Sequence, residues 1–196
     1  TFTALDGSES TVPFMHRTLR TNYASVDGAE VVELPYSGEQ VSMVVIVPDE
    51  GTFAAFEQDL NADRLFDVFG QLREGQGTLA LPRFEFETKI RLSEALSELG
   101  MPVAFGSEAD FGGMVEGGGR GLQIDEVYHE AFVSVDEEGT EAAAATAVVV
   151  RESAPPEWGE LRVDRPFLFC VRDRPTNAIL FLGRVVDAGE TRPGDE

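Results

Sequence analysis

Few side chains in this sequence have the type and spacing that catalysis or metal binding requires. The two histidines, His16 and His129, lie far apart, and neither has a second ligand at metal-binding spacing. Zinc sites need clustered histidine and cysteine, and the sequence has no Gly-x-Ser-x-Gly nucleophile motif. The single Cys170 lies in the apolar run FLFCVRD, so we expect a buried hydrophobic residue rather than a nucleophile activated by His129. These residues predict no enzyme, no metal site and no cofactor.

The most unusual segment is EEGTEAAAATAVVVRESAPPEW, residues 137–158. Thr140 as N-cap and the four alanines that follow Glu141 fit a helix, whereas the three valines favour a strand because they are β-branched. In a strand, one set of alternate side chains carries no charge: Thr140, Ala142, Ala144, Thr146, Val148 and Val150. The other set holds the charges of Glu141 and Arg151. Such a strand could bury one face, and the double proline would end it.

The rest of the sequence predicts an α+β fold that is rich in strands. We expect a hairpin within 31–51, whose strand Val41–Val47 is buried on both faces, and a hairpin formed by 165–173 and 178–186. Apolar spacing predicts helix over 52–72, with Thr52 as N-cap, and a short amphipathic helix over 91–101. Strands are predicted within 78–88 and over 122–138, and residues 107–121 form an irregular connection. We see no repeat and no interdomain linker, so we expect a single domain.

Charge is the unusual bulk property of the chain. Its 196 residues contain 36 acids and 15 bases, for a net charge of −21, and Lys89 is the one lysine among the bases. A surface this acidic repels nucleic acid and anionic lipid, so neither partner is expected. No run of apolar residues is long enough to span a membrane. Because concentrated salt screens self-repulsion, we hypothesise a high-salt habitat and an acidic, halophilic protein.

Several motifs together resemble the serpin family. VYHEAFVSVDEEGTEAAAATA, residues 127–147, resembles the end of the fifth strand of the serpin main sheet followed by the hinge of the reactive-centre loop. LRVDRPFLFCV resembles the C-terminal serpin signature, here Asp164, Arg165, Pro166 and Phe167. Five further segments occur in the same order as in the family: VVELPYSGEQVSMVVIVP, LPRFEFE, LGMPVAF, ADFGGM and ILFLGRVV. The resemblance therefore covers essentially all of the chain.

The resemblance implies a serpin fold: several mostly antiparallel sheets with peripheral helices. It also implies that the fold is incomplete at the N-terminus, because the family's N-terminal half would precede Thr1. Residues 1–196 would be the C-terminal part of a single serpin domain, with the reactive-centre loop at about 137–160. We expect an extracellular location, with the cytoplasm as the alternative.

The function that the resemblance implies is suicide inhibition of a serine protease. The protease cleaves the loop and forms an acyl-enzyme, and the loop then inserts into the main sheet as a new strand. The alternative is a serpin-fold binding or structural module, or an inactive fragment, that inhibits nothing. Small, uncharged residues at the hinge favour inhibition, because a charge on the inserting face would be buried without a partner.

Individual residues follow from the same resemblance. The hinge comprises Glu137, Glu138, Gly139, Thr140, Glu141, Ala142, Ala143, Ala144, Ala145 and Thr146. His129 matches the buried histidine of the region where the family's main sheet opens. The family's hinge-to-bond spacing places the cleaved bond between Ser153 and Ala154, which suits an elastase-like or subtilisin-like protease. The bond from Arg151 to Glu152, which suits a trypsin-like protease, is the alternative.

Overall fold

The structure is a computed structural model that describes residues 1–26, 28–116, 121–136 and 156–189. Two compact units divide the described chain. The first contains Thr1–Phe84 together with the described residues from Ser134 onward, and the second contains Glu85–Val133. The architecture is α+β, and all strand pairs with a defined register are antiparallel except one. The expected α+β class is therefore confirmed.

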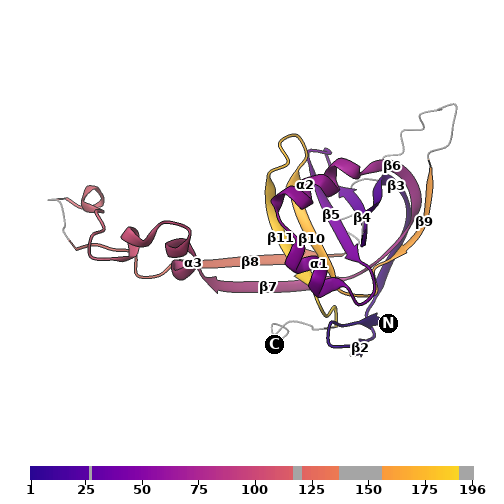
Figure 1. Cartoon of the computed structure of the whole chain (residues 1–196), viewed down its shortest axis with the longest axis horizontal. Coiled ribbons are helices and arrows are strands. Elements are labelled where there is room, and N and C mark those ends of the chain that lie inside the picture. The colour runs from indigo at the N-terminus through magenta and orange to yellow at the C-terminus, as the bar shows by residue number, and fades with distance from the viewer. Residues whose placement is uncertain (27, 117–120, 137–155, 190–196) are drawn as a thin grey trace. The chain divides into compact units, whose positions relative to one another are not determined.

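A seven-stranded sheet forms the first unit, with the strand order β11-β10-β5-β4-β3-β6-β9 (Figure 1). Its strands are β3 (Phe14–Val26), β4 (Ala29–Pro35), β5 (Val41–Pro48), β6 (Arg73–Pro82), β9 (Glu157–Arg162), β10 (Phe167–Asp173) and β11 (Ile179–Val185). The exceptional parallel pair is β6 with β9 at one edge. Two short strands, β1 (Phe2–Thr3) and β2 (Glu9–Ser10), form a separate ladder in the same unit.

The two hairpins predicted from the sequence are present. Between β4 and β5 the chain turns at Gly38 and Glu39, which have φ angles of 86° and 55°. Every residue of β5 after Val41 is buried, as its nearly continuous apolar run predicts. β10 and β11 pair in the second hairpin, and β10 also pairs with β5. The apolar strands β4, β5 and β10 therefore lie side by side in the sheet.

The predicted helix over 52–72 is in fact two helices, α1 (Phe53–Asp59) and α2 (Ala62–Gln71). Leu60 is extended, and the side chain of Asn61 caps α2 by accepting from the amide of Arg64 at 3.0 Å. Thr52 does not cap α1 with its side chain, because its hydroxyl donates to the carbonyl of Asp49 instead. The apolar spacing is helical on both sides of residues 60 and 61, but the cap at Asn61 starts a new helix.

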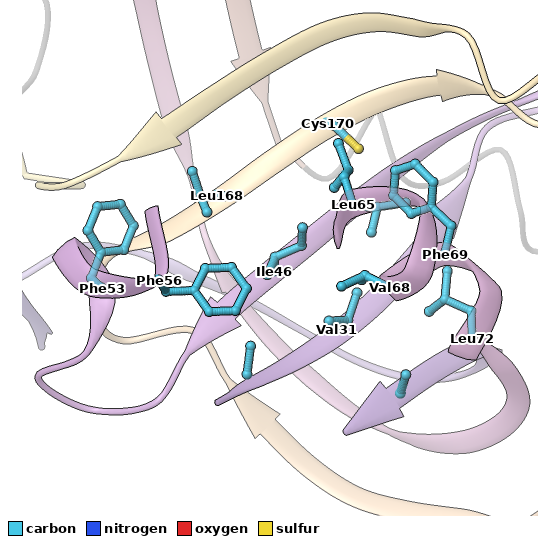
Figure 2. Packing of buried hydrophobic residues seen from close by; sticks show 13 residues of the cluster. Val31, Ile46, Phe53, Phe56, Leu65, Val68, Phe69, Leu72, Leu168 and Cys170 are labelled. Atoms are coloured by element: carbon cyan, nitrogen blue, oxygen red, sulfur yellow. The ribbon is translucent and has the colours of Figure 1, made fainter. Parts of the chain in front are cut away.

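Both helices pack on the sheet through one hydrophobic cluster (Figure 2). They contribute Phe53, Phe56, Leu65, Val68 and Phe69, with Leu72 following α2. The sheet contributes Ala24, Ala29, Val31, Val44, Ile46, Leu168 and Cys170. Because burying each large side chain is worth ~1.5–3 kcal/mol, this cluster fixes the helices on the central strands.

The second unit contains most of a pair of strands and several short helical segments. β7 (Phe84–Arg91) and β8 (Tyr128–Val135) form a two-stranded sheet, joined through α3 (Ser93–Glu98), η1 (Pro102–Phe105) and η2 (Gly112–Met114). The strand predicted within 78–88 is therefore interrupted at Arg83 and belongs to β6 and β7. The long strand predicted from residue 122 begins only at Tyr128, and the helix predicted over 91–101 is shorter and has no buried residue.

Candidate functional site

The residues that the sequence singled out divide between described and undescribed parts of the chain. The whole predicted hinge, Glu137–Thr146, lies outside the described residues, as do both candidate bonds, Ser153–Ala154 and Arg151–Glu152. The described structure gives the two ends of that segment. It is preceded by β8 and Asp136 and followed by Pro156 and β9. The segment therefore connects a strand of the two-stranded sheet to an edge strand of the seven-stranded sheet.

His129 lies in β8, where its side chain is exposed. This differs from the buried histidine that the resemblance implied. With Lys89 and Tyr128 it borders an open depression on the β7–β8 pair, where the Lys89 ammonium lies 3.1 Å from the carboxylate of Glu130. The physical reason for the difference is that β8 has only β7 as a sheet partner among the described residues, which is too little to enclose the ring.

The C-terminal end of the segment becomes a strand earlier than predicted. The resemblance places the loop at about 137–160, whereas β9 begins at Glu157. The amide of Gln76 in β6 donates to the carbonyl of Pro156 at 2.9 Å, so the pairing with β6 starts as soon as the described chain resumes. The register then shifts: Gln76 pairs with Glu157, and Gly77 pairs with Gly159.

The signature residues join three parts of the first unit. The guanidinium of Arg165 donates to the carbonyl of Pro48 at 2.9 Å and lies 3.9 Å from the carboxylate of Glu30. The carbonyl of Asp164 accepts from the amide of Thr3 at 2.8 Å. Phe167 is fully buried, with its ring centroid 5.5 Å from that of Phe84. The signature thus fixes the start of β10 by packing and hydrogen bonding, and none of these contacts is suited to catalysis.

Tyr23 connects the signature to the start of β9. Its hydroxyl donates to the carboxylate of Glu30 at 2.8 Å, and its ring stacks on that of Trp158 with centroids 4.9 Å apart and planes 9° apart. Burial, together with the hydrogen bond and negative charge of Glu30, raises the pKa of Tyr23 to about 12. The phenol therefore stays neutral and remains a hydrogen-bond donor at physiological pH.

A buried ionic network in the sheet was missed by the sequence reasoning. Glu33 in β4 is inaccessible to solvent, and its carboxylate accepts from Arg172, Ser42 and Asn22, each at 2.7 Å. The guanidinium of Arg172 also covers the ring of Phe69, 4.3 Å from its centroid. The available signal was a charged residue inside each of two apolar runs, VVELP and FLFCVRD.

The electrostatics of this network favour the ionised carboxylate. Burial alone raises the pKa of Glu33, but hydrogen bonds from Asn22, Ser42 and Arg172 outweigh it and hold the pKa below the ordinary glutamate range. Cys170 lies two residues before Arg172 in β10 and is fully buried. Burial raises the pKa of its thiol to about 11. The thiol is therefore protonated and enclosed, which does not suit a nucleophile.

Within the described residues, no cluster of three or more histidine, cysteine or acidic side chains could hold a metal ion. No helix in the part of the chain that the structure describes is long and apolar enough to cross a membrane.

Comparison with known proteins gives one family over nearly the whole chain. Residues 1–188 match the family model described as serpin (serine protease inhibitor). An uncharacterized serpin-like protein of Thermococcus kodakarensis is 41% identical over 179 residues, which are 90% of this chain and 41% of that protein. Mouse antithrombin-III is 36% identical over 190 residues, which are 95% of this chain and 41% of that protein. Human serpin B3 is 40% identical over 179 residues, which are 88% of this chain and 45% of that protein.

Among solved structures, a thermophilic serpin, tengpin, in its native state is similar with a TM-score of 0.76 and 32% identity. The match covers 95% of this chain and 49% of tengpin. The chain therefore spans about half the length of the relatives that it matches.

Proposed function

Because the chain belongs to the serpin family, we propose that the protein inhibits a serine protease and that the segment between β8 and β9 is the bait. The observation that carries the proposal is the composition of this segment. From Thr140 to Val150, alternate residues are small or β-branched and carry no charge. A strand with such a face can enter a sheet without burying an unpaired charge.

In the proposed mechanism, the catalytic serine of the protease attacks the carbonyl carbon of Ser153. An ester bond forms between that serine oxygen and the carbonyl carbon, the bond to the nitrogen of Ala154 breaks, and the nitrogen leaves as an amine after gaining a proton. Insertion of 140–150 beside β8 then competes with hydrolysis of the ester. About ten new ladder hydrogen bonds, at a net ~1 kcal/mol each, would favour insertion.

The proposed target is a subtilisin-like or elastase-like protease, because Ser153 has a small side chain. Arg151 supports a trypsin-like target as the alternative, although cleavage after Arg151 shortens the inserting segment by two residues.

The test is to incubate the full-length natural protein with subtilisin, elastase and trypsin and to look for a covalent complex that survives SDS. We expect a complex with subtilisin or elastase, and a released C-terminal peptide that begins at Ala154 by mass spectrometry. Ser153→Arg should gain trypsin inhibition, whereas Arg151→Ala, the matched control, should keep the original inhibition. A peptide that begins at Glu152 would move the bait to Arg151. Cleavage without a complex for all three proteases would overturn the proposal.

A further inference from the structure

β9 carries an unusual irregularity at its first residues. Gln76 pairs with Glu157 and Gly77 pairs with Gly159, so Trp158 is an extra residue without a partner in β6. Gly159 completes this bulge with a φ angle of 83°, a conformation that glycine adopts readily. Bulges are rare in parallel pairs, and a bulge redirects the side chain of the extra residue. Here it turns the indole of Trp158 onto the face of the sheet.

The indole of Trp158 packs directly against the backbone of Gly75 and Gly77, which have no side chains. A Cβ atom at Gly77 would lie 2.4 Å from the indole ring, and a Cβ atom at Gly75 would lie 2.7 Å from it, so neither position tolerates a side chain without displacing Trp158. Tyr23, in the strand beyond β6, covers the ring by stacking in parallel. Two glycines and an aromatic ring thus form a seat that fits one flat side chain.

Shape rather than hydrogen bonding selects the occupant of this seat. The indole N–H of Trp158 is buried and has no hydrogen-bond partner among the described residues. A donor left unpaired reduces stability, so the contact must depend on the ring surface. A phenyl ring should therefore replace the indole better than any aliphatic side chain.

The seat is also connected to the rest of the fold. The hydroxyl of Tyr23 donates to Glu30, whose carboxylate faces the guanidinium of Arg165 in the signature. Through these contacts, the packing of Trp158 links the start of β9, which follows the proposed loop, to strands β3, β4 and β6. Figure 1 shows β9 at the edge of the sheet, beside β6, which is its neighbour in the strand order.

The geometry points to Trp158 as a positioning residue for the proposed reactive loop, an inference that rests on the proposed function. The indole, seated on Gly75 and Gly77, fixes the C-terminal end of the loop only five residues after Ser153. A fixed end leaves fewer conformations for the residues that a protease must bind, and such preorganisation lowers the entropic cost of binding. The seat therefore affects how fast the protease binds and reacts with the loop. It does not affect the hinge, which lies at the other end of the loop.

The main variant is Trp158→Ala in the full-length protein, which empties the seat without a clash. We expect the second-order rate constant for reaction at the bait bond to fall about tenfold, the effect of freeing about one residue of backbone. The stoichiometry of inhibition should not change, because it depends on insertion after cleavage. Trp158→Phe should restore most of the rate.

Glycine variants test the seat from its other side. Gly77→Ala should displace the ring and lower the same rate constant, whereas Gly70→Ala is the matched control, because a Cβ at Gly70 in α2 meets nothing within 4 Å. Trp158 is the one tryptophan of the 196 residues, and any tryptophan elsewhere in the full-length protein cancels in the difference between the emission spectra of variant and wild type, so that difference reports the displacement. The emission maximum should shift to the red in Gly77→Ala and remain in place in Gly70→Ala.

The outcomes separate this inference from the proposed function. If no protease forms a complex, the rate constant of simple cleavage at the same bond replaces the inhibition rate, and the tenfold fall is still expected. An unchanged rate constant in Trp158→Ala would overturn the positioning role, even if its melting temperature fell. Equal rates for Trp158→Phe and Trp158→Ala would also overturn it, because the ring would then be irrelevant.

Discussion

Glu33 shows how a single charged residue is accommodated in a sheet of valine, leucine and isoleucine. Removing a carboxylate from water costs several kcal/mol, and here Arg172, Ser42 and Asn22 compensate with a hydrogen bond each. Arg174 adds a second guanidinium 3.4 Å from the same carboxylate oxygen. The ion pair of Glu33 and Arg172 therefore contributes stability only when both residues are present, because the loss of either one leaves the other charge buried with fewer partners.

We predict that Arg172→Met lowers the free energy of unfolding by about 3–5 kcal/mol, the usual cost of breaking a buried pair from one side. The double variant Glu33→Leu with Arg172→Met should lose less, because neither charge remains unpaired. Arg184→Met is the control, since the pair of Arg184 with Glu57 is largely exposed and should be worth at most ~1 kcal/mol. Urea denaturation measures all three. A double variant less stable than Arg172→Met would contradict the explanation.

The same network has a defined pH signature. The pKa of Glu33 is lower in the folded protein than its ordinary value of about 4.3 in an unfolded chain. Its contribution to stability is therefore complete above that ordinary value and is lost as the pH falls through the lowered folded pKa. Glu33→Gln should flatten the dependence of unfolding free energy on pH below about 4.3 relative to the wild type. Parallel curves would show that the acid dependence comes from other carboxylates.

Element boundaries were harder to predict than the elements themselves. The hairpins β4–β5 and β10–β11 were predicted because continuous apolar runs flank turn residues. The break at Leu60 and Asn61 was missed, because apolar spacing continues through it and only the cap reveals it. The bulge at Trp158 and its glycine seat were also missed, because they depend on two segments about eighty residues apart in sequence.

The candidate site divides in the same way. The sequence alone shows the composition of residues 137–155. The role inferred from that composition stays a prediction, because these residues lie outside the described structure. The exposure of His129 could not be read from alternation, because a two-face pattern shows which residues share a face and not whether anything covers it.

At the level of this segment, we predict that Thr140→Arg in the full-length protein converts an inhibitor into a substrate. Thr140 belongs to the uncharged set, so its side chain would enter the sheet first and would carry a charge into a buried position. Glu141→Arg is the matched control, because its set already contains charges and should face solvent. The stoichiometry of inhibition should rise steeply for the first variant and little for the second. Equal stoichiometries would refute the assignment of the two faces.

The whole molecule is dominated by its acidic surface. Fourteen of its fifteen basic residues are arginines, and several of them are bound in pairs, such as Arg172 with Glu33 and Arg20 with Glu74. The net charge is −21, and most of the acidic residues that the structure describes are exposed. Repulsion among them opposes folding at low ionic strength. It also disfavours association with polyanions, consistent with the proposed action on a protein target.

We predict that the melting temperature rises continuously with KCl concentration, by several degrees between 0.1 M and 1 M. The screening length falls from ~10 Å to ~3 Å over this range, so repulsion between exposed carboxylates is largely screened at 1 M. Sucrose at matched osmolality is the control, because it acts by exclusion from the surface and leaves the charges unscreened. Repulsion among carboxylates also weakens as they are protonated, so the KCl effect should shrink between pH 7 and pH 4. A melting temperature that stays flat or falls with KCl would remove both the role of self-repulsion and the proposed adaptation to high salt.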